Sequence, residues 1–241
     1  MDENFEKYIY DKQFNDNLLF FNRCFNDEEK TRNFLNRAYD LEKEKGSNSW
    51  IMLCQIQRLV TIANRMEEIY YARDGLRVVF IRTCLESMAY YSECDGKKKK
   101  SFFEEFSECF SSDAKKKIEK GIRLLGYENN SGKFFEDDSD CSVSNLLEIM
   151  RVARNRTVHD GVFWDTQIFA TEENSETKWC CEVDAETTDK VVLFGITSTK
   201  QNPLVYHFES TIGFETFCEF FIEACVTYVK KYMDNIQSEQ N

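Results

Sequence analysis

Residues 52–70 read MLCQIQRLVTIANRMEEIY, and this stretch decides the fold class. Its apolar side chains return every three or four positions, at Met52, Ile56, Leu59, Ala63, Met66 and Tyr70. This spacing places them on one face of an amphipathic helix of several turns. The sequence holds only one proline, Pro203, and 9 glycines, so few residues would interrupt further helices. We therefore predict a mainly α-helical protein.

The neighbouring sequence continues the helical pattern. Asp27 suits a helix N-terminus, and Gly46 suits the end of the same helix. The pair Asp74-Gly75 separates the helix of residues 52–70 from a second long helix over 76–94, and the two could pack antiparallel. Shorter elements follow, with helices over 102–110 and 114–125 and a polar, acidic loop over 129–140.

The helical periodicity of the sequence ends after residue 161. Short runs of β-forming residues alternate with polar turns, over 167–170, 179–183, 191–196 and 204–208, and predict a small antiparallel sheet. An amphipathic helix over about 211–235 then closes the chain. No proline-, glycine- or serine-rich linker separates these parts, which favours one continuous domain over the alternative of two domains. We predict a single domain over 1–241, with a helical core over about 1–161, a β insertion over about 162–208, and the C-terminal helix.

Composition limits the classes of function. No apolar run approaches the roughly 18 residues of a membrane span, so we expect a cytoplasmic protein without membrane contact. Ten cysteines without C-x-x-C pairs, together with two histidines, favour reduced thiols and give no support for a bound metal or cofactor. The net charge of -12 repels polyphosphates at long range. A local basic patch over 97–123 could still contact nucleic acid, although a solvated face and loop explain it better.

One polar cluster could carry out catalysis. A helix that Ser144 could cap leads into Arg154, Asn155 and His159, and Asp160-Gly161 marks its expected end. At about 100° per residue of an α-helix, Asn155 and His159 lie about 40° apart, whereas Arg154 and His159 lie about 140° apart. The arginine could therefore reach the same ligand only through its long side chain or from a partner surface.

These residue types suit transesterification at an RNA phosphate. Histidine, whose ordinary pKa is about 6.5, can move protons near neutral pH. Arginine presents a planar charged fork that binds a phosphate and stabilises the charge of the transition state. Asn155 would position the histidine or the phosphate. Glu86, from a partner helix, is a candidate supporting carboxylate, although an exposed helical glutamate needs no special explanation.

The string from Arg154 to His159 resembles the R-N-x-x-x-H form of the motif of the HEPN superfamily. This resemblance covers about twenty residues and implies a compact helical bundle. It also implies a metal-independent ribonuclease site with Arg154 and His159 as the catalytic pair and Asn155 beside them. Because such sites form where two HEPN domains meet, the resemblance implies a homodimer, whose twofold symmetry would bring two histidines to one phosphate.

We therefore expect a homodimeric HEPN endoribonuclease of defence or toxin type, acting on RNA without a cofactor and controlled by a cognate regulatory partner. One alternative is a non-catalytic HEPN-like module that binds a nucleotide or a protein. Another is a structural interaction protein assembled through the aromatic C-terminal helix. A fourth interpretation makes the motif an ordinary helix end, in which His159 and its neighbouring arginines complement the helix dipole.

Overall fold

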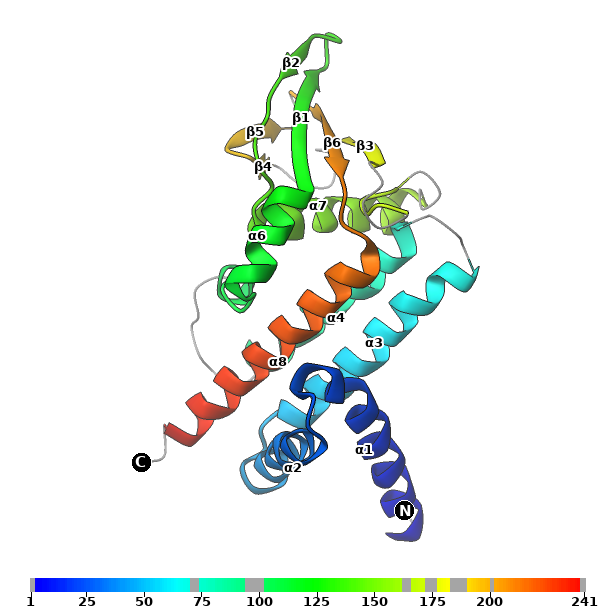
Figure 1. Ribbon diagram of the computed structural model, residues 1–241, viewed down its shortest axis with the longest axis vertical. Helices are drawn as coiled ribbons and strands as arrows, with labels where there is room; N and C mark the ends of the chain where they lie inside the picture. Colours follow the sequence, from blue (N-terminus) through cyan, green and yellow to red (C-terminus); the bar gives the residue numbers. More distant parts are fainter. Residues whose placement is uncertain are drawn as a thin grey trace. The chain divides into compact units, whose positions relative to one another are not determined.

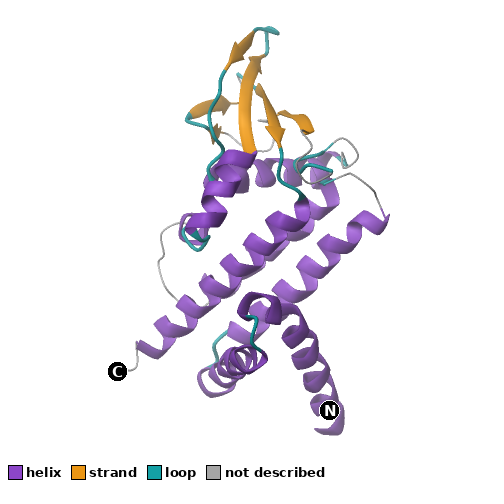
Figure 2. Cartoon of the chain, in the orientation of Figure 1, coloured by secondary structure: helices purple, strands orange, loops and turns teal. Residues whose placement is uncertain are grey.

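A computed structural model describes residues 3–69, 74–93, 102–161, 166–171, 177–182, 190–199 and 202–238. The structure is mainly helical, with a small antiparallel sheet before the C-terminal helix, which confirms the predicted fold class. The chain divides into two compact units, the first over 1–61, 83–109 and 221–241, and the second over 62–82 and 110–220. The described strands, orange in Figure 2, all lie within residues 110–220 of the second unit. A single domain over 1–241 stays a prediction.

The described residues of the first unit form helices and the loops between them. The unit contains α1 (Glu3–Phe25), α2 (Glu28–Lys45), α5 (Phe102–Ser107), and portions of α3 (Ser49–Ile69), α4 (Gly75–Glu93) and α8 (Phe214–Ser238). The caps of α2 confirm the sequence prediction. The Asp27 carboxylate accepts the Lys30 N–H at 3.0 Å, and Gly46 ends the helix in the left-handed region at φ 63°.

Apolar helix faces build the core of this unit. Met52 and Ile56, from the stretch that predicted the fold class, are completely buried. Phe221, Tyr228 and Tyr232 of α8 are buried as well, and the ring centroid of Phe221 lies 5.6 Å from that of Phe106. Helix α4 matches the predicted 76–94 helix, while Tyr70 and residues 94–100 lie outside the described residues. Burial of these large side chains supplies the main stabilisation of the helices.

The second unit contains α6 (Ser112–Gly121), α7 (Val143–Asn155) and the strands. In Figure 1, β2 (Phe134–Glu136), β1 (Ile122–Asn129), β6 (Leu204–Ser210) and β3 (Thr177–Glu182) form one antiparallel sheet in that order. Strands β4 (Lys190–Leu193) and β5 (Ile196–Thr199) form a separate antiparallel pair. The part of the chain that the structure describes contains no helix long and apolar enough to cross a membrane.

The sheet extends beyond the predicted insertion. The helix predicted over 114–125 ends at Gly121, and the loop predicted over 129–140 contains β2. Strand β1 forms because its alternate side chains, including Ile122 and Leu124, are buried and because its backbone pairs with β6. That partner lies about eighty residues later in the chain, so local periodicity gave no sign of the pairing.

Gly126 sits at an irregular point of β1. The pairing with β6 shifts register between Leu124 and Gly126, as in a β-bulge. Gly126 has a φ of 153°, and a Cβ there would lie 2.4 Å from the backbone oxygen of Phe135 on β2. The close approach of β2 therefore requires glycine at this position.

Candidate functional site

Helix α7 positions the first two motif residues, in the second unit. Its N-cap is Ser142, whose hydroxyl accepts the Asn145 N–H at 3.2 Å, so the predicted cap at Ser144 was wrong by two residues. The apolar face of α7 is buried, which fixes the rotation of the helix. As a consequence, Arg154 and Asn155 are half-buried at the C-terminal end of α7.

A π-helical turn, Arg156–Asp160, carries the rest of the motif and follows α7 directly. The turn ends, as predicted, at Gly161, which has a left-handed φ of 68°. The angles predicted for an ideal α-helix do not hold across this turn. A helix whose N–H groups bond five residues back contains more residues per turn, so it rotates less per residue. The separation of 140° predicted between Arg154 and His159 is therefore too large.

The three motif residues differ in their contacts. Arg154 donates a hydrogen bond from Nη1 to the side-chain oxygen of Asn155 at 3.1 Å. The side chain of His159 is exposed, and its imidazole makes no hydrogen bond or ion pair with any described residue. A ligand that arrives from solvent can reach this imidazole.

Glu86 belongs to a different unit of the chain from the three motif residues. It lies on α4 in the first unit and is half-buried, whereas Arg154, Asn155 and His159 belong to the second unit. The structure thus brings three of the four predicted residues into one segment. A catalytic role for Glu86 stays a prediction.

The other histidine is placed differently. His207 lies on β6, where its ring contacts the Phe134 ring edge-on with centroids 5.3 Å apart. Its Nε2 lies 3.9 Å from a carboxylate oxygen of Glu128 on β1. These contacts agree with the predicted position on the outward side of a strand. Because both histidines of the sequence belong to the second unit, His207 offers a matched control for His159.

Acidic side chains neutralise some of the positive charges in the predicted basic patch. Arg123 on β1 forms ion pairs with Glu209 and Asp138, and Lys117 on α6 pairs with Asp113. Residues 97–100, which supplied four of its lysines, lie outside the described residues. These pairs favour the solvated-surface interpretation for the described part of the patch.

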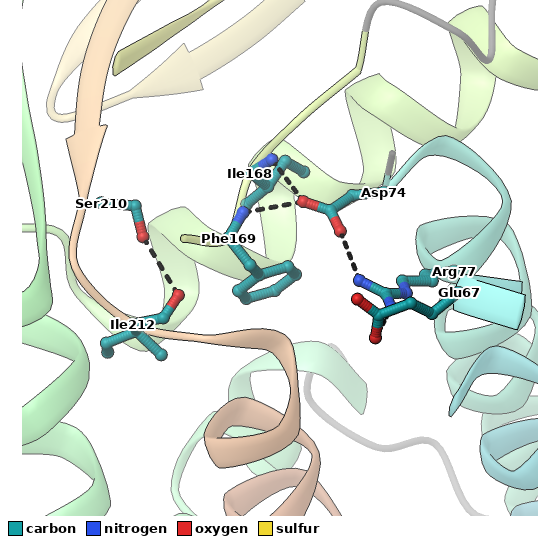
Figure 3. A network of polar contacts seen from close by, with 7 residues as sticks. All are labelled: Glu67, Asp74, Arg77, Ile168, Phe169, Ser210 and Ile212. Carbon is teal, nitrogen blue, oxygen red and sulfur yellow. Dashed lines mark hydrogen bonds and ion pairs between the residues drawn. The ribbon is translucent and has the colours of Figure 1, made fainter. Parts of the chain in front are cut away.

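Sequence analysis missed a buried polar network, drawn in Figure 3. The Asp74 carboxylate, at the start of α4, accepts the backbone N–H groups of Ile168 at 2.7 Å and Phe169 at 2.8 Å. Its second oxygen lies 3.3 Å from Nη1 of Arg77. The opposite nitrogen of Arg77 pairs with Glu67 at 2.6 Å. Burial raises the pKa of Asp74, and the two backbone N–H groups and the Arg77 charge oppose that rise.

This network explains why the strand predicted over 167–170 was wrong. The N–H groups of Ile168 and Phe169 bond to a side chain instead of a neighbouring strand, and only an isolated bridge joins Ala170 to Gly213. Asp74 had been interpreted as part of a separator between helices. An aspartate just before a helix is a common N-cap, and that signal could have pointed to Asp74, although not to its partners.

The network lines a cavity of about 250 Å³ in the second unit. The guanidinium of Arg77 lies over the ring of Phe214, 4.6 Å from its centroid, and bridges Asp74 and Glu67. Its charge is thus already shared between two carboxylates. These contacts hold the start of α4 against residues 166–169. They favour this structural role over the binding of an anion.

A larger cavity of about 680 Å³ lies in the first unit, among α1, α2 and α3. Its wall includes Tyr10, Tyr39 and Trp50, whose rings contact one another, and the carboxylate of Glu42. Glu42 accepts the Ile51 N–H at 3.0 Å and so caps the first turn of α3. Burial raises the pKa of Glu42 above its ordinary value of 4.5, against the effect of the backbone N–H groups.

Metal-ligating side chains do not cluster among the described residues. No group of three or more histidine, cysteine, aspartate or glutamate side chains is arranged there to hold a metal ion. Seven of the cysteines whose side chains the structure describes are free thiols, at positions 24, 54, 84, 109, 141, 218 and 225. Burial raises the pKa of Cys141 far above its ordinary value, so this thiol stays protonated.

Comparison of the chain with known proteins found no matching family model, no matching curated protein and no matching solved structure.

Proposed function

We propose that this protein is a homodimeric, metal-independent endoribonuclease of HEPN type that acts in the cytoplasm. The observation that carries the proposal is the Arg154, Asn155 and His159 cluster, which joins an ordered arginine to an exposed histidine at one helix end. The motif resemblance supplies the reaction class, and the exposed imidazole supports it. A role in defence or as a toxin, under a cognate regulatory partner, belongs to the same proposal.

The proposed reaction is an internal transesterification. The ribose 2'-oxygen forms a bond to the adjacent phosphorus while the bond from phosphorus to the 5'-oxygen breaks. The 2'-hydroxyl loses its proton to a base, and the departing 5'-oxygen receives one from an acid. The products are a 2',3'-cyclic phosphate and a 5'-hydroxyl.

The motif residues divide these tasks. His159 exchanges protons with the two ribose oxygens, and Arg154 stabilises the negative charge that grows on the non-bridging phosphate oxygens. Asn155 holds the guanidinium in place through the 3.1 Å hydrogen bond. One histidine cannot easily act as acid and base in the same step, so a second subunit would supply the other imidazole.

The net charge of -12 shapes the expected binding of RNA. A strongly acidic protein repels a polyanion at long range, so binding depends on a few local cations. We expect selective RNA binding whose affinity falls as salt increases, in place of general RNA binding. The alternative of a non-catalytic nucleotide-binding module takes support from the same acidity.

The test is cleavage of RNA in the presence of a chelator by the wild type, His159→Ala and His207→Ala proteins. We expect the wild type and His207→Ala to cleave, and His159→Ala to lose at least about 100-fold in rate. The new ends should be cyclic phosphate and 5'-hydroxyl. Both variants should bind RNA alike, measured by fluorescence anisotropy.

Two results would contradict the proposal. Full cleavage by His159→Ala would remove His159 from the reaction, and loss of wild-type cleavage on adding chelator would make the activity metal-dependent. Tight nucleotide binding by a wild-type protein that turns over no RNA would favour the non-catalytic module.

A further inference from the structure

The π-helical turn at Arg156–Asp160 is the least ordinary backbone feature of the motif. Such turns make up well under about 1% of residues in soluble proteins and occur mostly as single turns inside α-helices, often at functional sites. Here the turn begins two residues after Arg154 and contains His159. The relative direction of these two residues decides whether they face one ligand. The cause of the turn therefore bears on the site.

A buried threonine hydroxyl marks the start of the turn. Thr157 Oγ1 donates a hydrogen bond of 2.9 Å to the backbone oxygen of Ala153, and Thr157 is 7% exposed. The same carbonyl also accepts the N–H of Arg156. A threonine that bonds to the carbonyl four residues earlier competes with the backbone N–H for that carbonyl and loosens the α-helix locally. At Ala153 the hydroxyl shares the carbonyl with the N–H of the residue three positions later, at the point where the α-helix gives way to the π turn. The same hydroxyl bond at Thr227 lies within the unbroken helix α8.

The wider turn changes the direction of His159. In a regular α-helix, five residues rotate the chain to a separation of about 140°. A π turn rotates the chain by roughly 80° per residue, so Arg154 and His159 come closer to the same side. Asn155 and His159 remain neighbours in either geometry, since four residues make about one turn. The π turn therefore brings Arg154 toward the pair of Asn155 and His159.

We propose that Thr157 is a positioning residue, whose hydroxyl holds the π turn and so aligns His159 with Arg154. This inference rests on the proposed ribonuclease function for its chemical consequence. Thr157 itself touches no substrate and acts through His159. Gly161 closes the turn in a left-handed conformation that non-glycine residues rarely adopt.

The test compares Thr157→Val, which keeps the shape and loses the hydroxyl, with Thr157→Ser, which keeps the hydroxyl. We expect Thr157→Val to lower kcat about tenfold or more with KM within about twofold, and Thr157→Ser to stay within about threefold of wild type. In NMR spectra, Thr157→Val should shift the amides of residues 156–161 and the imidazole signals of His159.

Thr227 offers a matched control. Its hydroxyl donates to the backbone oxygen of Glu223 at 2.9 Å, with the same spacing of four residues, on the exposed side of α8. Thr227→Val should leave kcat and the His159 imidazole signals unchanged. If Thr157→Val fails to fold, Thr157→Ala makes the same comparison.

Unchanged amide signals over residues 156–161 in Thr157→Val would overturn the inference, because the hydroxyl would then not hold the turn. Shifted amides with wild-type kcat would overturn the positioning role. If the wild type cleaves no RNA, the proposed function fails, and the imidazole signals of His159 then decide the inference alone, since unmoved signals would overturn it.

Discussion

Nη1 of Arg154 donates a hydrogen bond of 3.1 Å to the side-chain oxygen of Asn155, its neighbour in the chain. This bond holds one edge of the guanidinium at the end of α7. A side chain with four rotatable bonds is thereby ordered before any phosphate binds, which lowers the entropy lost on binding. Asn155 was predicted to position the histidine or the phosphate, whereas its side-chain oxygen accepts this bond from Arg154.

Arg154→Lys should lose most of the cleavage activity although it keeps the charge. Lysine cannot bind a phosphate through two parallel hydrogen bonds, and it cannot keep the same bond to Asn155. We expect a fall of at least about 100-fold in kcat, measured on a fluorescent RNA. Arg151→Lys is the control, since Arg151 on the same helix is already bonded twice to Glu148. A similar loss in both variants would point to damage of α7.

Asp74→Ala should destabilise the protein by about 3 kcal/mol, measured by urea unfolding. The substitution leaves two buried backbone N–H groups without an acceptor and removes one partner of Arg77. Glu67→Gln changes the other partner of Arg77. Because the Glu67 side chain is 43% exposed, this substitution should lower the free energy of unfolding by less than about 1 kcal/mol. Equal losses in the two variants would contradict the structural role of the buried carboxylate.

Glu42 should make stability fall as pH rises above its ordinary pKa of 4.5. Burial raises the pKa of Glu42 in the folded protein, so the unfolded chain loses this proton first. Its contribution to stability is complete below 4.5 and is lost as pH rises through the raised value. Glu42→Gln keeps an acceptor for the Ile51 N–H and removes the titration.

Urea unfolding between pH 4 and pH 7 measures this effect. The stability of wild type relative to Glu42→Gln should decline across the window just above the ordinary pKa and then level off. A relative stability that rises with pH would mean that the pKa of Glu42 is lowered on folding.

The sequence predicted features whose causes are local. Asp27 and Gly46 end α2 as expected, because capping depends on a few neighbouring residues. The buried face of α3 followed from its apolar spacing. Arg154, Asn155 and His159 were placed at a helix end before Gly161, and the structure places them there.

Features that depend on distant partners could not be predicted in this way. Strand β1 needs β6, and the role of Asp74 needs Ile168 and Phe169, more than ninety residues later. The π turn was missed for another reason. The residues 154–159 fit an α-helical pattern, and the hydroxyl of Thr157 that loosens the helix gives no signal in hydrophobic periodicity.

The central claim is that two copies of the motif act on one phosphodiester, and mixing wild type with His159→Ala tests it most directly. The two proteins are assayed for RNA cleavage after subunit exchange in a 1:1 mixture, in which about half of the dimers carry one histidine. A shared site that needs both imidazoles leaves only the wild-type dimers active, so we expect cleavage at about a quarter of the rate of the same concentration of wild type. Cleavage at about half of that rate, although exchange is confirmed by mass, would contradict a site shared between two subunits.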